Sequence, residues 1–134
     1  MAGTGVSTFD NEDAMDWISG FGGDGANGVV EALETINEME KGDYIEGDVA
    51  AYALAAAEVV AAARDGDTSR LPKETVSSLE ENAAKINAAS LLAPARKAVL
   101  RVLKNSELQE QWADTPDHED WEDDVRELLE RLKG

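Results

Sequence analysis

The sequence has 134 residues, no cysteine, and 29 acidic residues against 12 basic ones, which gives a formal net charge of −17. This length fits one domain that buries its own core. The lack of cysteine excludes disulfides, cysteine-ligated metal centres and thiol catalysis, and the negative charge argues against nucleic acid or an anionic membrane as the main partner. With no signal-like start and no membrane-length apolar run, we expect a cytoplasmic protein without a membrane span.

The charge is unevenly distributed along the chain. Residues 1–48 contain 12 acids and one base, and residues 106–134 contain 11 acids and three bases. The segment between them has 6 acids and 8 bases, so two acidic ends flank a slightly basic middle. Plain solubility or a salt-tolerant cytoplasm explains this pattern, and so does an acidic face for a basic protein partner or a cation.

Helical periodicity begins near the N-terminus. Apolar residues recur at helical spacing over 11–20, and we expect Asp10 to be the N-cap of this first helix. Residues 20–28 contain five glycines in nine positions, which predicts a flexible connector within the domain. A second helix is expected from about Asn27 to Lys41.

The third predicted helix, over 48–65, is apolar on nearly every side. Nine of the residues from Ala50 to Ala63 are alanine, and Gly66 follows as a C-terminal stop. A helix that is apolar all round and built of small residues is typical of a central element with neighbours on several sides. We therefore expect the other helices to surround it.

Four more helices are expected, over 73–88, 94–105, 107–113 and from about 117 to the end. Pro94 fits the first turn of its helix, and Ser106 with Gln109 fits a capping box. The last helix carries one apolar stripe, formed by Trp121, Val125, Leu128 and Leu132. No segment alternates with period two, so the sequence predicts a single all-α domain over 1–134, with about seven helices around the alanine-rich one and the tryptophans in the core.

Three acids lie three residues apart at the start of the first helix, namely Asp10, Asp13 and Asp16. Their carboxylates can share one side of the helix, and with Glu12 they offer the oxygen ligands that a hard cation prefers. The spacing does not match an EF-hand loop, which needs a glycine at its sixth position. Helix capping and the helix dipole also explain these acids without any metal.

Two further patterns predict no cofactor and no metal centre. Residues 20–25 match G-x-G-x-x-G, but a dinucleotide site needs a strand before this loop, and here a helix precedes it. His118 is the only histidine, so a histidine-based metal cluster cannot form.

Glu58 is the one charged residue in the apolar part of the predicted central helix. A buried carboxylate is costly unless it is paired, and desolvation raises its pKa. We expect Arg96 or Arg101, or the hydroxyl of Tyr44 or Tyr52, to pair with it. The alternative is that Glu58 is a functional acid or a ligand contact.

A basic stripe stands out in this acidic sequence. Lys97, Arg101 and Lys104 follow one another at helical spacing. They are expected to form ion pairs with the acidic terminal helix, and the alternative is that they bind a small anionic ligand or an acidic partner.

Three groups of residues form a recognisable pattern along almost the whole chain: Phe9, Asp10, Asn11, Ala14, Asp16 and Trp17 at the first helix, Ala55 to Val59 in the alanine-rich helix, and Ser106 to Leu108, Trp112, Trp121, Arg131 and Leu132. In this pattern the chain resembles the bacterial domain-of-unknown-function 4259 family. Thr4 and Ser7 depart from the pattern, where a tryptophan and a glycine are expected. The resemblance implies a small helical bacterial protein and supplies no reaction, ligand or catalytic residue.

These observations favour a non-enzymatic protein-interaction or regulatory module, because the sequence has no nucleophile–base set, no metal cluster and no cofactor loop in context. Its acidic surface, from the first and last helices, is expected to bind a basic protein partner. One alternative is a small-ligand- or cation-binding protein, hydrolytic or not, with Glu58 and the N-terminal acids in one pocket. Another is an immunity protein or a nucleic-acid mimic that acts as an inhibitor.

Overall fold

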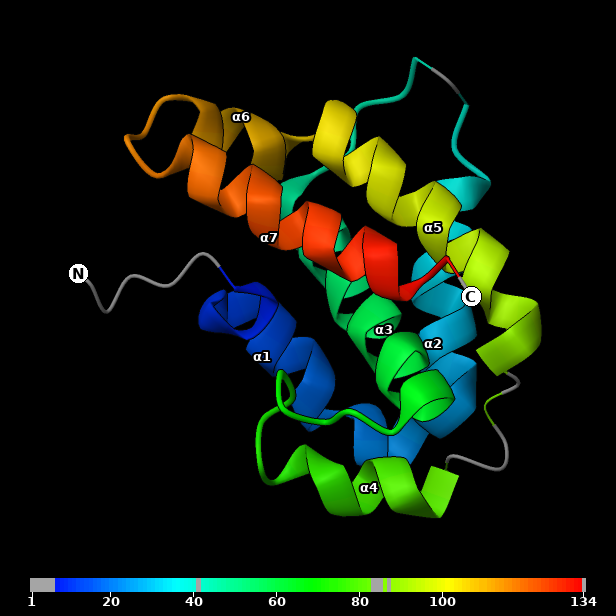
Figure 1. The fold of residues 1–134 in the computed structure, drawn as a ribbon. Helices are drawn as coiled ribbons and strands as arrows, with labels where there is room; N and C mark the ends of the chain where they lie inside the picture. Colours follow the sequence, from blue (N-terminus) through cyan, green and yellow to red (C-terminus); the bar gives the residue numbers. More distant parts are fainter. Residues whose placement is uncertain (1–6, 41, 83–85, 87, 134) are drawn as a thin grey trace.

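The computed structural model describes residues 7–40, 42–82, 86 and 88–133. Within these residues it contains seven α-helices, one short 3₁₀-helix and no strand, which confirms the predicted all-α class (Figure 1). The elements in chain order are η1 (Thr8–Asp10), α1 (Glu12–Ser19), α2 (Phe21–Asn37), α3 (Gly47–Asp65), α4 (Thr75–Asn82), α5 (Ala88–Lys104), α6 (Glu107–Ala113) and α7 (His118–Arg131).

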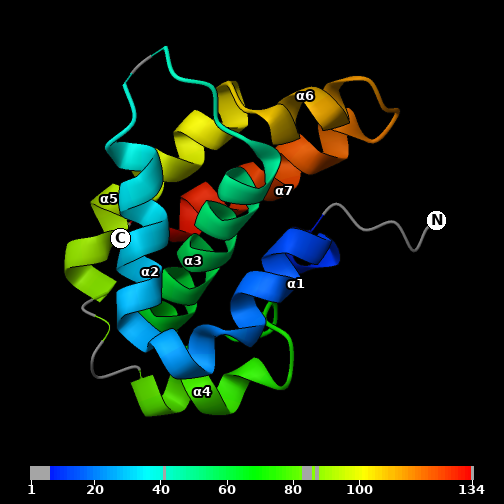
Figure 2. The ribbon, with the colours of Figure 1, turned by 180° about the vertical axis from the view of Figure 1, so that it is seen from behind.

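Helix α3 lies at the centre of the molecule, and the other helices are arranged around it (Figures 1 and 2). It contacts α1, α2, α5, α6 and α7, and from Ala50 to Ala62 only Tyr52 is not fully buried. The short alanine side chains let neighbouring helices approach α3 from several directions. The structure therefore confirms a compact helical domain built around the alanine-rich helix.

Specific contacts hold both ends of α3. At its N-terminus, the backbone N–H of Gly47 donates to Oε1 of Glu107 at 2.6 Å, and the N–H of Glu107 donates to the carbonyl of Ile45 at 2.8 Å. A carboxylate suits this position because it satisfies an unpaired N–H at the positive end of the helix dipole. At the other end, Gly66 stops the helix with a left-handed φ of 77°, as predicted.

The first helix starts differently from the prediction. Asn11, not Asp10, is the N-cap of α1, and its Oδ1 accepts hydrogen bonds from the N–H groups of Asp13 and Ala14 at 2.8 and 3.1 Å. Asp10 belongs to η1, which ends just before the cap. Because this short helical turn occupies Asp10, the capping position moves one residue along the chain.

The predicted connector over 20–28 is largely helical in the structure. Helix α2 begins at Phe21, which is 1% exposed and stacks on Trp17 with ring centroids 6.2 Å apart. Only Gly25 within α2 leaves the helical region, with φ 56° and ψ −138°, and a Cβ there would lie 2.6 Å from Oδ1 of Asn82. Anchoring of the aromatic ring outweighs the poor helix propensity of the glycines, and Gly25 produces the kink against α4.

Helix α2 ends earlier than predicted, at Asn37 rather than near Lys41. Helix α4 spans Thr75–Asn82, and the rest of its predicted range lies largely outside the described residues, which leave out 41, 83–85 and 87. Arg101 of α5 donates to two carbonyls near the C-terminus of α2, at 2.6 and 2.9 Å, and these bonds help to fix where α2 stops.

Helix α5 begins at Ala88, so Pro94 lies inside the helix and not in its first turn. A proline removes one N–H from the helical hydrogen bonds, but α5 packs along both α2 and α3, which keeps the helix continuous. The carbonyl of Pro94 accepts a hydrogen bond of 2.9 Å from Nδ2 of Asn37 in α2. Tertiary contacts thus decide the start of this helix.

The C-terminal helices agree with the prediction. The hydroxyl of Ser106 caps α6 by accepting from the N–H of Gln109 at 3.0 Å. In α7 the predicted stripe is buried and faces the core, with its members at most 2% exposed: Trp121, Val125, Leu128 and Leu132. This stripe places the acidic side of α7 outward.

Candidate functional site

The first candidate site is a buried ion-pair network around Glu58. The Glu58 side chain is 1% exposed, and it accepts three hydrogen bonds from Arg70, from Nε to both oxygens at 3.1 Å and from NH2 to Oε2 at 2.7 Å. The hydroxyl of Thr8 in η1 donates to the same Oε2 at 2.8 Å. Arg131 of α7 adds a longer ion pair at 3.6 Å. Both carboxylate oxygens therefore face protein donors.

The network connects segments that are far apart in the sequence. Arg70 lies in the loop after α3 and also binds Asp124 of α7, with NH2 2.9 Å from Oδ2. Arg131, at the end of α7, binds Asp65 at the end of α3, with NH2 3.1 Å from Oδ1. Two arginines thus join α3, its following loop, η1 and α7 through charge-assisted hydrogen bonds, which are the strong kind.

The predicted partners of Glu58 are wrong. Arg96 donates to the carbonyl of Leu132 at 2.7 Å, Arg101 turns to the end of α2, and Tyr44 donates to Glu110 at 3.1 Å. Neither these three nor the half-buried Tyr52 bonds to Glu58 in the part of the chain that the structure describes. Arg70 was the only arginine that followed α3 closely, twelve residues after Glu58. Its position in the short segment after the helix was the sequence signal that could have identified Arg70 as the partner of Glu58.

Burial and pairing shift the pKa values of this network in opposite directions. Burial raises the pKa of Glu58, and the hydrogen bonds from Arg70 and Thr8 oppose this rise without cancelling it. Burial likewise raises the pKa of Asp124, against the pull of Arg70. For Asp65 the effect of burial is outweighed by the hydrogen bond from Arg131, so its pKa is lowered. Each oxygen of Glu58 accepts a hydrogen bond from Arg70, so the carboxylate is paired inside the protein.

The N-terminal acids only partly share a pocket with Glu58. Asp10 lines a hollow of about 400 Å³ together with Glu58 and Arg70. Asp13 and Asp16 line a different hollow of about 300 Å³ beside α1, which Asp10 also lines. Of the three acids in the predicted shared pocket, the structure therefore brings Asp10 alone to Glu58. Among the described residues no three acidic or histidine side chains form a group that could hold a metal ion.

The basic stripe on α5 divides in the structure. Arg101 binds backbone carbonyls at the end of α2 and not the acidic terminal helix, so the ion pairs predicted for it are wrong. Lys97 and Lys104 are exposed. The guanidinium of Arg101 lies at the negative end of the α2 dipole and compensates it. The spacing of basic residues along α5 could not show this role.

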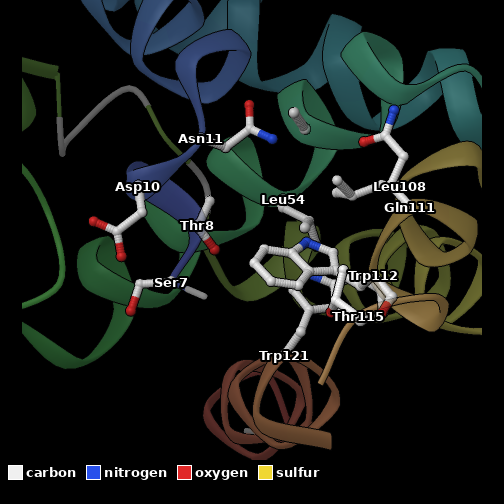
Figure 3. A pocket seen from close by; sticks show the side chains of 11 residues that line it. Ser7, Thr8, Asp10, Asn11, Leu54, Leu108, Gln111, Trp112, Thr115 and Trp121 are labelled. Carbon is white, nitrogen blue, oxygen red and sulfur yellow. Dashed lines mark hydrogen bonds between the residues drawn. The ribbon is translucent and has the colours of Figure 1, made fainter. Parts of the chain in front are cut away.

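The second candidate site is a cavity of about 320 Å³ on the other side of η1, enclosed by η1, α3, α6 and α7. The indoles of Trp112 and Trp121 reach into it from α6 and α7 (Figure 3). Apolar side chains supply the rest of its surface, and polar ones stand around them. These further lining residues are Ala51, Leu54, Leu108, Ser7, Thr8, Asp10, Asn11, Gln111 and Thr115.

The polar groups of this cavity include acceptors and donors. The hydroxyl of Thr8 donates to Glu58, and that of Thr115 donates to the carbonyl of Trp112 at 2.8 Å, so both keep only acceptor lone pairs for a ligand. The indoles and the amides of Asn11 and Gln111 carry N–H donors. Among the described residues that line the cavity, the only charged side chain is the carboxylate of Asp10, with no lysine, arginine or histidine. The cavity therefore combines apolar rings with a single negative charge.

Little in the residue pattern indicates this cavity. The tryptophans were expected in the core, and Trp121 is indeed 2% exposed, whereas Trp17 and Trp112 are only half-buried. The lining comes from η1 and from helices more than 40 residues further along the chain. Local patterns identify the apolar side chains but not the space that remains between them.

The fold and these two sites define a small all-α domain in which a saturated ion-pair network lies next to an open aromatic cavity. The chain belongs to the Domain of unknown function (DUF4259) family, whose model matches residues 3–124, and this confirms the resemblance seen in the sequence. No curated protein and no solved structure matches the chain. None of the described helices combines the length and apolarity that a bilayer span needs.

Proposed function

We propose that this domain is a non-enzymatic protein-interaction module that binds a basic segment of a partner protein. Its binding surface is the acidic face, which we define as the exposed carboxylates of α1, α6 and α7, three elements that meet near the tryptophan cavity at η1, α6 and α7. These residues are Glu12, Asp16, Glu110, Glu119, Asp120, Asp123, Glu127 and Glu130. The proposal is supported by the placement of the charges: most arginines bind groups inside the protein, whereas these carboxylates are exposed.

Four of the arginines point inward and leave most of this face without compensation. Arg70 and Arg131 serve the Glu58 network, while Arg96 and Arg101 bind backbone carbonyls. The acidic face keeps a few exposed pairs: Arg126 lies 4.0 Å from Asp123, Arg70 lies 3.8 Å from Glu127, and Lys133 pairs with Glu130. Exposed pairs of this kind contribute little energy. The acidic face therefore carries a larger excess of negative charge than the numbers of acidic and basic residues in the sequence suggest. The electric field of this face attracts a basic segment and speeds the association of that segment with the domain.

A capture experiment with matched charge variants tests the proposal. One variant neutralises the outer side of α7 with Asp120→Asn, Asp123→Asn, Glu127→Gln and Glu130→Gln. The control removes the same four charges from the exposed side of α2 and the residues after it, with Glu31→Gln, Glu34→Gln, Glu38→Gln and Glu40→Gln. We expect the wild type and the α2 control to capture the same basic protein from cell extract, and the α7 variant to lose it. Raising the salt should weaken capture steeply, because salt screens exposed charges.

Equal loss in both variants would show a general charge effect and contradict the proposal, and so would the absence of any basic partner. If duplex DNA competes for the captured protein, the nucleic-acid-mimic alternative gains support over simple interaction.

A further inference from the structure

We infer that the tryptophan cavity is the anchor site of the acidic face, and that it receives an aromatic side chain flanked by lysine or arginine in the partner. This inference rests on the proposed function, because it assigns the chemistry of the partner at the same surface. It goes further by naming the group that enters the protein and the two side chains that hold it.

The size and lining of the cavity fit one aromatic group. At about 320 Å³ it lies at the lower end of the range of binding pockets. Trp112 and Trp121 present indole rings, and Leu54 and Leu108 add apolar contacts (Figure 3). Aromatic rings pack favourably against indoles, and residues inserted into such pockets carry most of the energy in protein interfaces.

The charges around the cavity determine what must accompany the ring. The lining has the Asp10 carboxylate and no basic side chain. The hydroxyl oxygens of Thr8 and Thr115 accept but do not donate. Ammonium and guanidinium groups are pure donors that pair with a carboxylate and with such oxygens. An anchor with basic neighbours therefore complements Asp10, whereas Asp10 would repel an acidic segment.

The wall of the cavity is fixed before any partner arrives. Thr8 in η1 is 7% exposed and is tied to Glu58, which two arginines hold in turn. A wall that is already ordered does not lose conformational freedom on binding, and this preorganisation favours affinity. The ion-pair network thus supports the cavity from behind.

Three capped tripeptides separate the contribution of the ring from that of the charge: acetyl-Lys-Phe-Lys-amide, acetyl-Lys-Ala-Lys-amide and acetyl-Glu-Phe-Glu-amide. Phenylalanine is chosen because tryptophan fluorescence then reports on the protein alone, and NMR of the indole N–H groups identifies which tryptophan responds. We expect the Lys-Phe-Lys peptide to bind at least about tenfold more tightly than the other two. Its binding should perturb Trp112 and Trp121 but not Trp17.

Two protein variants check the location. Trp112→Leu removes a half-buried ring and should weaken the Lys-Phe-Lys peptide to the level of the Lys-Ala-Lys peptide, with helicity measured to confirm the fold. Asp10→Asn should weaken the basic peptides by a few-fold, and Glu31→Gln, with the same change in net charge on α2, should not.

Each contrary result has its own meaning. Equal binding of the Lys-Phe-Lys and Lys-Ala-Lys peptides would overturn the anchor while leaving the acidic face as the proposed interaction surface. Equal binding of the Glu-Phe-Glu peptide would keep an aromatic site but contradict a basic partner. Absence of binding by all three, or binding that Trp112→Leu does not change, would also overturn the inference.

Discussion

The two regions on either side of η1 treat polar groups in opposite ways. On one side, Glu58 is enclosed and both its oxygens are engaged by Arg70, Arg131 and Thr8. On the other, Trp112 and Trp121 border an open cavity with one carboxylate, Asp10, in its lining. The first arrangement pairs its charged groups within the protein, and the second leaves apolar and polar surface available to a ligand. An ion-pair network of this kind holds its own segments together, whereas the cavity beside it is the surface at which we propose recognition.

η1 is the wall that the two regions share. Ser7, Thr8 and Asp10 line both the hollow beside Glu58 and the tryptophan cavity. A change on one side of this wall is therefore expected to be felt on the other. Substitutions on either side of η1 can show whether stability and recognition are separable.

The largest effect is expected for Glu58→Ala. This substitution removes the buried carboxylate from two partly buried arginines, which keep Asp124 and Asp65 as partners, and loss of one partner from a buried pair typically costs about 3–5 kcal/mol. Chemical denaturation measures the free energy of unfolding. The control is Arg126→Ala, which breaks only exposed pairs at 4.0 Å and should change stability by less than about 0.5 kcal/mol. Similar losses in both variants would contradict a structural role for the network.

Thr8→Val tests the coupling between the two regions. Valine keeps the shape of the side chain but removes the donor to Glu58, so the free energy of unfolding should fall by about 1.5–3 kcal/mol, as for other hydrogen bonds to charged groups. Because Thr8 also lines the cavity, affinity for the Lys-Phe-Lys peptide should fall as well. Ser7→Ala, at an exposed position in the same wall, is the matched control. If Thr8→Val changes stability but leaves peptide affinity intact, the two regions are independent.

The dependence of stability on pH provides a third test. The pKa of Glu58 is raised from its ordinary 4.5 in the folded protein, so above that pH the folded state binds more protons than the unfolded chain. Because of Glu58, the free energy of unfolding should therefore fall as the pH rises through the pKa that Glu58 has in the folded protein. The slope of this fall is at most about 1.4 kcal/mol per pH unit.

Glu58→Gln should flatten this decline when unfolding is measured at successive pH values. Asp65→Asn should act in the opposite direction, because the pKa of Asp65 is lowered and its contribution is lost as the pH falls. A Glu58→Gln curve parallel to that of the wild type would show that burial does not shift this group.

The smallest effect concerns the other end of α3, near the cavity. Glu107→Ala removes the acceptor for the N–H of Gly47 and should lower the free energy of unfolding by about 0.5–2 kcal/mol, the range measured for helix caps. Glu110→Ala, which removes an exposed carboxylate of the same helix, is the control and should change stability less. Hydrogen exchange should show faster opening of the first turn of α3 in Glu107→Ala only.

Much of the fold was predictable because it depends on local periodicity. The alanine-rich run that became α3, the stripe from Trp121 to Leu132 and the glycine stop at Gly66 all follow from neighbouring residues. The errors occur where a distant contact outweighs local preference. Burial of Phe21 holds the glycine-rich segment in a helix. Packing against other helices lets α5 begin several residues before Pro94.

The candidate sites were less predictable for a related reason. Glu58 was recognisable from the sequence because a single charge in an apolar helix must find a partner. Its partners were not, since several arginines had the right chemistry and only the path of the chain brings Arg70 and Thr8 to it, the latter from 50 residues away. Likewise, Trp112 and Trp121 were visible as apolar residues, but a cavity is the space that folded elements leave between them.

Local sequence is thus sufficient for the helical class, the central helix and the outward acidic side of α7, because helix periodicity and burial of apolar side chains act between near neighbours. The pairing of Glu58, the wall formed by η1 and the opening of the tryptophan cavity arise only when distant segments meet. Those contacts depend on the geometry of the whole chain, and no short stretch of residues contains that geometry.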